Sequence, residues 1–266
     1  MHTLLKNPSL KLLLARDKLI MQDTFENGLG SWQTDGSWHK VTVDSNADQS
    51  SGLDGNLALD CMGAYEAGTV EKTVVLKNYG EISFEHYVQN NKNEGTNYLR
   101  FYIDDTLKLE IKGPSPWYRC DPIGLTPGEH TLKFEYVLEG APNEKKAVVD
   151  TIVIEEAKDV PCLITTYKPP KPIKNLAKNS ILRGYTTYQE MVESDTEIEF
   201  VATFNGLEFH EFMIQSDREF YFVDEFGVCY RGIFEEAPEP KSIALRKVYY
   251  VELILVASSK VGIGFC

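Results

Sequence analysis

Apolar and polar residues alternate with a period of two along most of the chain. In residues 98–103, Leu99, Phe101 and Ile103 share one face of an extended segment, and tyrosine and arginine side chains share the other. Residues 107–112 repeat this pattern. Because a strand presents successive side chains to opposite faces, the alternation predicts strands that bury one face. Few segments have apolar residues at the three-to-four-residue spacing of an amphipathic helix.

Clusters of Gly, Asn and Pro separate the alternating segments. They fall at residues 89–97, 112–117 and 125–130, and such clusters are typical of turns. Many short strands with turns at this spacing predict an antiparallel sandwich or barrel. We therefore expect an all-β protein that combines an antiparallel jelly-roll β-sandwich with a second, smaller β domain.

A change of composition near Lys158 divides the chain. Residues 158–180 are rich in Pro and Lys and show no alternation, which predicts an extended linker. The sandwich then covers residues 22–157, and the smaller domain, interpreted as an assembly anchor, covers residues 181–266. Residues 1–21 belong to neither domain by pattern. One interpretation makes them a strand of the smaller domain, so that the sandwich is an insertion.

The smaller domain is expected to contain two hairpins and one long strand. Asn205-Gly206 stands between two alternating segments and is a strong signal for a tight hairpin turn. Residues 224–227 predict a second hairpin turn. Residues 247–257 alternate without interruption, which predicts the final strand.

Charge and hydropathy exclude two classes of partner. The 266-residue chain has a formal net charge of −13, whereas surfaces that bind nucleic acid or anionic lipid need clustered Lys and Arg. No stretch has the apolar length that a bilayer span requires, so we expect no membrane insertion. The acidic surface is interpreted as a means of solubility.

The cysteines predict neither disulfides nor a zinc site. They are odd in number, widely spaced and without a CxxC pair, which is typical of a reducing cytoplasm. Charged residues interrupt the first 20 positions and no small-residue cleavage site follows, so we expect no signal peptide. The five cysteines are Cys61, Cys120, Cys162, Cys229 and Cys266.

An ordered set of short motifs runs through residues 23–157. In chain order the motifs are Phe25-Glu26, Ile82 to Phe84, Phe101 to Asp105, Trp117, Pro127 to Tyr136, and Asp150 to Ile152. This order resembles the MAM-type jelly roll and related carbohydrate-binding-module sandwiches. The resemblance implies a jelly-roll fold and a lectin-like role. The disulfide cysteines typical of extracellular MAM domains are absent.

The last part of the chain carries a second, fainter resemblance. Residues 220–237 and 247–257 follow each other as a strand, a hairpin and a final strand, and this order resembles small β modules of bacteriophage tail proteins. The resemblance implies a non-enzymatic tail or baseplate component of a virion. It would be made in the bacterial cytoplasm, oligomeric in the assembly, and partnered by other virion subunits and a host-surface glycan.

Two alternatives to host attachment through a glycan stay open at this stage. One is a purely structural tail protein without a ligand. The other is an accessory binding module of a polysaccharide-degrading enzyme.

Adjacent carboxylates at Asp104-Asp105 raise the question of glycosidase chemistry. Catalytic carboxylates must flank a sugar at a separation of about 5 to 9.5 Å, which two adjacent acids at a hairpin tip do not provide. Asp is favoured in turns because it tolerates positive φ. We expect a three-residue turn at 104–106 and no catalytic pair.

A second set of acids could hold a structural calcium ion. Glu26 and Asp150 lie on the first and last strands of the expected sandwich, which a jelly roll brings together, and the resemblance implies calcium there. Asp23 is a candidate third ligand. Calcium prefers six to eight oxygen ligands, so backbone carbonyls would complete the site. The alternative is that Glu26 bonds a loop and Asp150 caps a turn.

Aromatic and polar residues share the outward faces of two expected strands, residues 81–89 and 98–103. Sugars are bound by flat aromatic faces combined with polar groups, so we treat the strands as neighbours and predict a glycan site there. The alternative is that tyrosines occur because they suit strands. A loop tryptophan is a sugar platform if exposed and a core residue if buried. The predicted site consists of Tyr87, Gln89, Tyr98, Arg100, Tyr102 and Trp117.

Overall fold

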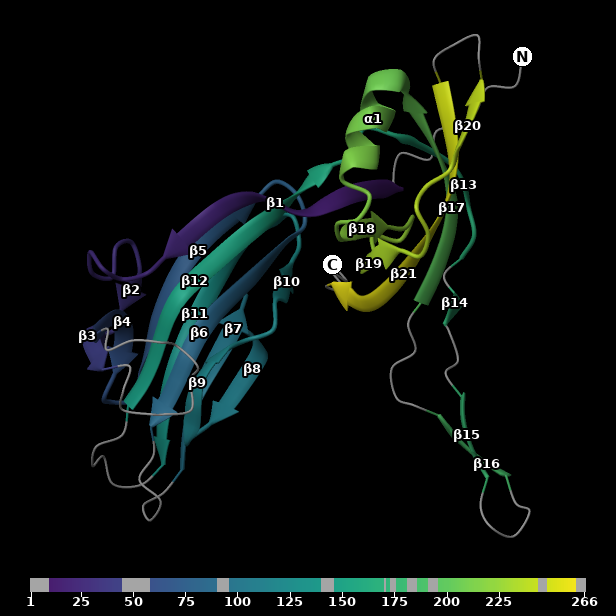
Figure 1. Cartoon of the computed structure of the whole chain (residues 1–266). Coiled ribbons are helices and arrows are strands. Elements are labelled where there is room, and N and C mark those ends of the chain that lie inside the picture. The colour runs from purple at the N-terminus through teal and green to yellow at the C-terminus, as the bar shows by residue number, and fades with distance from the viewer. Residues whose placement is uncertain are drawn as a thin grey trace. The chain divides into compact units, whose positions relative to one another are not determined.

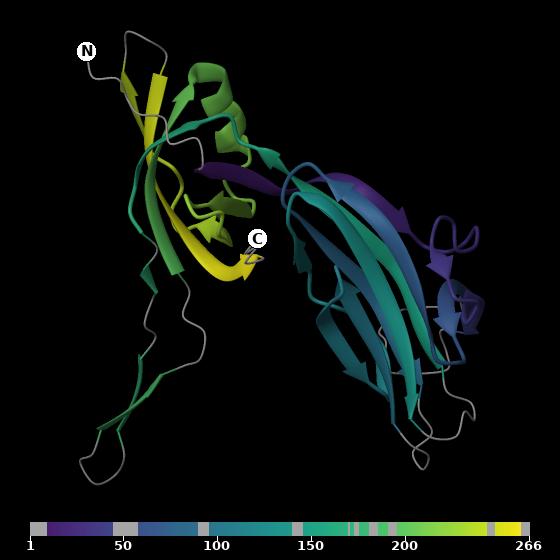
Figure 2. The same cartoon turned by 180° about the vertical axis from the view of Figure 1, so that it is seen from behind.

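The described part of the computed structural model forms two compact units (Figures 1 and 2). Unit 1 comprises Met1–Asp17 and Ala157–Cys266, and unit 2 comprises Lys18–Glu156. Strand β1 (Lys11–Asp23) continues from unit 1 into unit 2, and β12 (Lys146–Asp159) returns. The structure describes residues 10–44, 58–89, 96–139, 146–169, 171–172, 176–180, 186–190, 196–243 and 248–261.

One sheet of unit 2, here called the β6 sheet, runs in the order β3–β4–β12–β6. Both β9 and β10 pair with the other edge of β6. All of these pairs are antiparallel. The bounds are β3 (Trp38–Asp44), β4 (Ala58–Ala64), β6 (Gly80–Gln89), β9 (Ser115–Arg119) and β10 (Ile123–Leu125).

The second sheet of unit 2, here called the β11 sheet, has the order β2–β5–β11–β7–β8. Its bounds are β2 (Gln33–Thr34), β5 (Gly68–Leu76), β7 (Thr96–Ile103), β8 (Thr106–Lys112) and β11 (Gly128–Glu139). The chain changes sheet after β1, β2, β4, β5, β6, β8, β10 and β11, which is the winding of a jelly roll. The predicted all-β fold with an antiparallel sandwich is confirmed.

The core of unit 2 is aromatic and follows the predicted alternation. Leu99, Phe101 and Ile103 on β7 are buried. The ring centroid of Phe134 lies 4.9 Å from that of Phe84 and 4.8 Å from that of Phe101, so one cluster joins the two sheets. One expected core residue is misplaced, because a register shift in the β7–β8 ladder leaves Leu107 46% exposed.

Unit 1 consists of antiparallel strands and one helix. The first residues of β1 pair with β18, and the order continues β18–β19–β21–β17–β13. Strand β14 pairs with β17, β20 pairs with β21, and β15 pairs with β16. The bounds are β13 (Leu163–Tyr167), β14 (Lys171–Pro172), β15 (Leu176–Ser180), β16 (Thr186–Glu190), β17 (Thr196–Asn205), α1 (Gly206–Ile214), β18 (Phe220–Val223), β19 (Cys229–Phe234), β20 (Pro240–Ile243) and β21 (Val248–Val261).

Two expectations for unit 1 hold and two are wrong. The hairpin around residues 224–227 and the long final strand are confirmed. The linker predicted at residues 158–180 is wrong, because it contains strands. Leu163–Tyr167 form β13 against β17, with Ile164 buried in the core, and Leu176–Ser180 form β15 against β16. The second error is the hairpin predicted at Asn205-Gly206, where the structure has helix α1 instead.

Helix α1 begins at Asn205 because that residue caps it. The Asn205 side chain accepts a hydrogen bond from the Glu208 amide, and the Glu208 carboxylate accepts one from the Asn205 amide. This reciprocal pair is a capping box, which satisfies two amides of the first turn. Phe212 then packs on Phe204 at a centroid separation of 4.7 Å. The cap and the buried ring outweigh the hairpin tendency of Asn-Gly.

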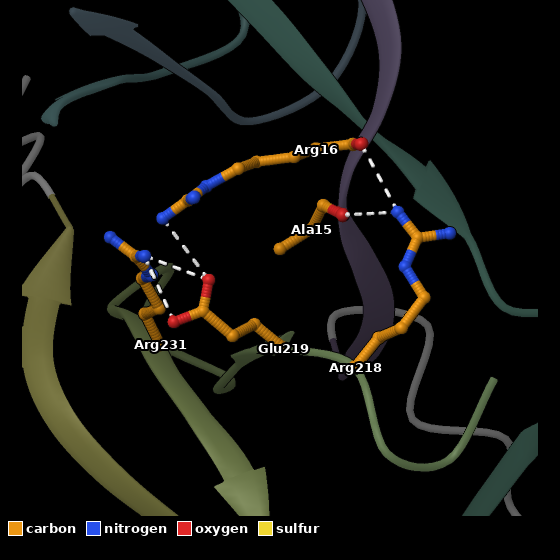
Figure 3. A network of polar contacts seen from close by, with 5 residues as sticks. All are labelled: Ala15, Arg16, Arg218, Glu219 and Arg231. Atoms are coloured by element: carbon orange, nitrogen blue, oxygen red, sulfur yellow. Dashed lines mark hydrogen bonds and ion pairs between the residues drawn. The ribbon is translucent and has the colours of Figure 1, made fainter.

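A network of charged side chains holds β1 within unit 1 (Figure 3). Glu219 lies between Arg16, at 3.1 Å, and Arg231, whose guanidinium donates to both carboxylate oxygens at 2.9 and 2.7 Å. Arg218 donates to the backbone carbonyls of Ala15 and Arg16. Arg16 has a φ of 50°, so the network fixes the strand where its backbone departs from extended geometry.

Candidate functional site

The predicted sugar-binding residues do not share one face. Tyr87 and Gln89 lie on β6, and Trp117 lies on β9, so all three belong to the β6 sheet. Tyr98 and Tyr102 lie, with the arginine between them, on β7 in the β11 sheet. The expectation that the two strands are neighbours is wrong, because the chain crosses between the sheets after β6. The prediction therefore separates into two groups.

The β7 group stands on the outer face of the β11 sheet, away from the core. Tyr98, Arg100 and Tyr102 are half-buried and alternate with the buried Leu99 and Phe101. A strand rises about 3.3 Å per residue, so two tyrosines four positions apart stand about 13 Å apart on the same face. We call these three residues the tyrosine row.

Charged side chains from the neighbouring strands surround the tyrosine row. Arg100 Nε donates to Glu110 of β8 at 2.7 Å, and its guanidinium lies 3.8 Å from Glu135 of β11. The Tyr102 hydroxyl donates to the same Glu135 at 2.7 Å. Lys133 of β11 places its ammonium 4.8 Å from the Tyr102 ring centroid. The face thus carries rings, donors and acceptors together.

The electrostatics of this face keep its donors protonated. Hydrogen bonding and charge from Glu110 raise the pKa of Arg100. Burial, followed by the hydrogen bond to Glu135, raises the pKa of Tyr102. The pKa of Lys133 is raised chiefly by its hydrogen bond to Asp105. Two cations and one phenol therefore stay donors at neutral pH, beside two carboxylate acceptors.

Sequence reasoning missed the partners Glu110, Lys133 and Glu135. Period-two alternation places each of them on the outward face of its own strand, as the structure does. The register that sets Arg100 opposite both Glu110 and Glu135 comes from strand pairing, which alternation alone does not specify.

The β6-sheet group differs from the tyrosine row because it is buried. Tyr87 is only 8% exposed and packs with Val41, Cys61 and Val148. The half-buried Trp117 stacks on Tyr87 with a centroid separation of 5.7 Å and an interplanar angle of 23°. Tyr87 is thus not a presented platform, and the prediction that it offers its face to a ligand is wrong.

Polar residues continue the outer face of the β6 sheet beyond this cluster. Arg119 of β9 donates to the Ser83 hydroxyl at 3.0 Å and lies 3.7 Å from Glu85. Gln89 is half-buried at the end of β6, and its backbone carbonyl accepts a hydrogen bond from Asn97 at 2.8 Å. Gln89 lies on the opposite sheet from the tyrosine row, so it takes no part in that face.

The three predicted calcium ligands differ in what they contact. The Asp23 carboxylate accepts hydrogen bonds from Trp32 Nε1 at 2.8 Å and from Lys72 at 2.7 Å. Glu26 is exposed, and its backbone carbonyl accepts from Lys40 at 2.6 Å. Asp150 is 5% exposed, and its Oδ1 has no hydrogen-bond partner within the described residues. Of the three predicted ligands, Asp150 therefore has a carboxylate oxygen that is free to accept a hydrogen bond or to bind a cation.

Asp150 also carries an electrostatic cost as a carboxylate. Burial raises the pKa of Asp150 to about 6, and the charges of Glu85 and Glu26 add to the rise, although hydrogen bonds from Thr151 oppose it. A nearby cation would offset this cost. The three predicted ligands do not group as a metal site among the described residues. A calcium ion at Asp150 and Glu26 would need backbone carbonyls to complete its ligands, and the calcium site stays a prediction.

The paired carboxylates Asp104 and Asp105 form a hairpin turn, as predicted. Both residues have positive φ, 50° and 59°, and together they make the two-residue loop between β7 and β8. This is the backbone of a type I′ turn, so the expected three-residue turn is one residue too long. Asp105 pairs with Lys133 at 2.6 Å.

Asp104 is held by two groups of the neighbouring strand. His130 Nδ1 lies 2.6 Å from one carboxylate oxygen of Asp104, and the Thr131 amide donates to the other at 2.8 Å. Partial burial acts to raise the pKa of Asp104, but these hydrogen bonds outweigh it and the pKa lies below its usual value. Its contacts are those of a turn.

The described part of the chain has few other residues that could form a reactive or metal-binding site. Cys61, Cys120, Cys162 and Cys229 are free thiols, and Cys266 lies outside the described residues. Within the described ranges, no three or more His, Cys, Asp or Glu side chains group as a metal site. No helix there has the length and apolar character of a membrane span.

Comparison with known proteins gives structural likenesses only. No protein-family model matches the chain, and no curated protein matches it. The chain is similar to the K3 adhesin domain of Lys-gingipain from Porphyromonas gingivalis, with 17% identity, a TM-score of 0.34, and coverage of 52% of this chain and 100% of that one.

Carbohydrate-binding modules are among the similar structures. The CBM22-1 xylan-binding domain from Paenibacillus barcinonensis has 12% identity, a TM-score of 0.37, and coverage of 54% of this chain and 97% of that one. A family 35 carbohydrate-binding module from Clostridium thermocellum has 14% identity, a TM-score of 0.32, and coverage of 50% and 95%. At these identities and TM-scores, function is inferred from the residues of this chain alone.

Proposed function

We propose that unit 2 binds a glycan on the outer face of the β11 sheet through the tyrosine row. The observation that carries the proposal is the placement of Tyr98 and Tyr102, half-exposed on one strand with Arg100 between them. Aromatic faces pack against the C–H faces of sugar rings, and polar groups bind the hydroxyls and fix orientation.

The charges around the row suit hydroxyl groups. A sugar hydroxyl both donates and accepts hydrogen bonds. Glu110 and Glu135 offer acceptors on either side of the donor Arg100. These side chains are between 30% and 41% exposed, so a ligand can reach them without unfolding the sheet.

The spacing of the row favours an extended ligand. The two tyrosines stand about 13 Å apart along β7, so a ligand that contacts both spans more than one sugar ring. Arg100 lies 5.5 Å from the Tyr98 ring centroid, and Lys133 lies over Tyr102. Both cations would have to shift for sugars to stack on the faces they now occupy.

We infer binding without cleavage. The carboxylates beside the row, Glu110 and Glu135, both interact with the guanidinium of Arg100. Glycosidases need one carboxyl group held as an acid and a second placed across the scissile bond. An assay for new reducing ends on bound polysaccharides tests this part, and release of sugar would contradict it.

The decisive experiment is a binding screen with matched variants. Wild-type protein is applied to a glycan array and to bacterial cell-wall polysaccharides, together with Tyr98→Ala, Tyr102→Ala and Tyr65→Ala. Tyr65 is 44% exposed elsewhere in unit 2 and serves as the control. We expect each row variant to lose about tenfold in affinity or more, and Tyr65→Ala to bind normally. Absence of binding to all polysaccharides, or equal loss in the control, would overturn the proposal.

The biological setting stays a prediction from the sequence. A place in a phage tail or baseplate, oligomeric assembly with other virion subunits, and host-surface attachment all follow from the fainter resemblance. Mass spectrometry of purified phage particles would test the location. If another subunit covers the tyrosine row in such a particle, the row is an assembly surface and the glycan proposal fails.

A further inference from the structure

A cleft opens in unit 2 where the edges of the two sheets part. One wall is β8 at the edge of the β11 sheet, and the other is formed by β9, β10 and the chain between them, along the edge of the β6 sheet. Its volume is about 490 Å³, which is the size of a small-molecule site. We call it the edge cleft, and its inner lining is His86, Leu109, Ile111, Tyr118, Cys120 and Ile123.

The inner lining of the edge cleft is largely apolar. Leu109, Ile111 and Ile123 are partly buried and pack against the core of unit 2. Four charged residues with exposed side chains also line the cleft, namely Lys108, Glu110, Lys112 and Asp121. An apolar interior beside exposed charges is the usual construction of a site for a small organic molecule.

His86 supplies the polar group of this lining. The residue is 4% exposed, and its Nδ1 has no hydrogen-bond partner in the described part of the chain. Burial lowers the pKa of His86 to about 4, so the ring is neutral at neutral pH. A buried nitrogen without a partner carries a desolvation cost that a ligand can remove.

The neighbours of His86 include aromatic rings and a thiol. Its ring centroid is 6.2 Å from that of Phe84 and 5.9 Å from that of Tyr118. Cys120 is engaged elsewhere, since its sulfur accepts a hydrogen bond from the Phe84 amide at 3.3 Å. Burial raises the pKa of Cys120 to about 11, so it is a neutral thiol and part of the apolar lining.

We propose that the edge cleft binds a small planar apolar molecule that carries one hydroxyl group, of the phenol class. The hydroxyl bonds His86 Nδ1, and the ring packs against Leu109, Ile111 and Tyr118. A hydroxyl satisfies either tautomer of the imidazole, because it can donate or accept. A sugar fits less well, because its other hydroxyls would face the apolar lining.

The edge cleft and the tyrosine row meet only at Glu110, which lines the cleft and accepts the hydrogen bond of Arg100. The row lies on the outer face of β7, whereas His86 points inward from β6 and is cross-strand partner to Tyr118 of β9. The proposal therefore does not depend on glycan binding. A water molecule on Nδ1 is the competing explanation, and it predicts no preference for a hydroxyl-bearing ligand.

The test compares p-cresol with toluene, which differ by one hydroxyl. Both are titrated into ¹⁵N-labelled full-length protein up to the solubility of toluene, and binding is followed by NMR shifts of amides and of the His86 ring nitrogens. We expect p-cresol to bind about tenfold more tightly than toluene. We also expect p-cresol, and not toluene, to shift the His86 ring signals.

Two variants and a control complete the experiment. His86→Leu should abolish the preference for p-cresol, and Tyr118→Ala, at a 58% exposed position, should weaken both ligands. Tyr65→Ala should change neither. If the thermal melt shows that His86→Leu does not fold, two other measurements test the proposal. They are the NMR shifts of the His86 ring nitrogens in the wild type and the titration of Tyr118→Ala. No binding, equal binding of both ligands, or binding that ignores Tyr118→Ala would overturn the proposal.

Discussion

The two outer faces of the unit 2 sandwich come from strands with the same alternation but differ in burial. On β6, the outward Tyr87 is 8% exposed and stacks under Trp117 in an apolar cluster. On β7, the outward Tyr98 and Tyr102 are half-exposed among charged neighbours. Alternation decides which face a side chain takes, and packing on that face decides whether the side chain is available to a ligand.

The contrast also separates stability from recognition. A tyrosine packed in an apolar cluster contributes to folding and offers little surface to a ligand. A tyrosine in a charged, half-exposed row contributes less to folding and leaves its ring and hydroxyl within reach. Substitutions on the two faces should therefore affect stability and binding differently. All three tryptophans lie in unit 2, so tryptophan fluorescence reports on the unfolding of that unit.

The largest effect is expected from truncating the buried tyrosine. Tyr87→Ala should lower the unfolding free energy of unit 2 by about 3–4 kcal/mol, because it removes a buried ring and leaves a cavity. Tyr102→Ala should cost about 1 kcal/mol or less, since its ring is half-exposed. Denaturant unfolding followed by tryptophan fluorescence measures both. Equal losses in the two variants would remove the distinction between the faces.

A pH-dependent effect is expected from Asp150 on the β6 sheet. Its folded-state pKa of about 6 lies above the ordinary value of 3.8, so between these values the folded state holds a proton that the unfolded state has released. Stability from this group is therefore present at low pH and is lost as pH rises to about 6. Relative to wild type, Asp150→Asn should gain about 1–3 kcal/mol between pH 4 and 7.

The measurement for Asp150 is a series of unfolding curves at fixed ionic strength with a chelator present. His86 has the opposite dependence, because its lowered pKa makes the unfolded state bind more protons between about 4 and 6.5. Comparing Asp150→Asn with wild type at each pH cancels that contribution. A difference that does not change with pH would mean that Asp150 is already ionised in the folded state.

Calcium binding gives the next effect in size. If calcium binds at Asp150 and Glu26, wild type should gain about 1.4 kcal/mol at a concentration ten times the dissociation constant. Asp150→Asn should gain nothing from calcium. Thermal melts with calcium and with chelator measure this, and magnesium serves as a control because it demands a tighter octahedral site. An unchanged wild-type midpoint would count against the calcium prediction.

The sequence predicts the strands of unit 2 well, because each strand buries one face and so keeps a strict period. It predicts the Asp104-Asp105 turn because two strands of matched phase meet there. It does not predict that β6 and β7 belong to different sheets. A connection of the length found between them can join two strands of a hairpin or lead from one sheet to the other. It also misreads α1, where the Asn205–Glu208 capping box was available as a signal beside the Asn-Gly hairpin motif.

The smallest effect concerns the ion pair that organises the tyrosine row. Arg100 and Glu110 are 30% and 41% exposed, so their pairing is screened by water and should contribute about 0.2–1 kcal/mol. A double-mutant cycle with Arg100→Met and Glu110→Gln measures the coupling, at low and high salt. A value in this range that falls with salt means that the side chains can leave each other for a ligand at little cost. A coupling above about 2 kcal/mol that ignores salt would make the row a structural element like the Tyr87 cluster, and the comparison between the faces would no longer favour β7 as the binding strand.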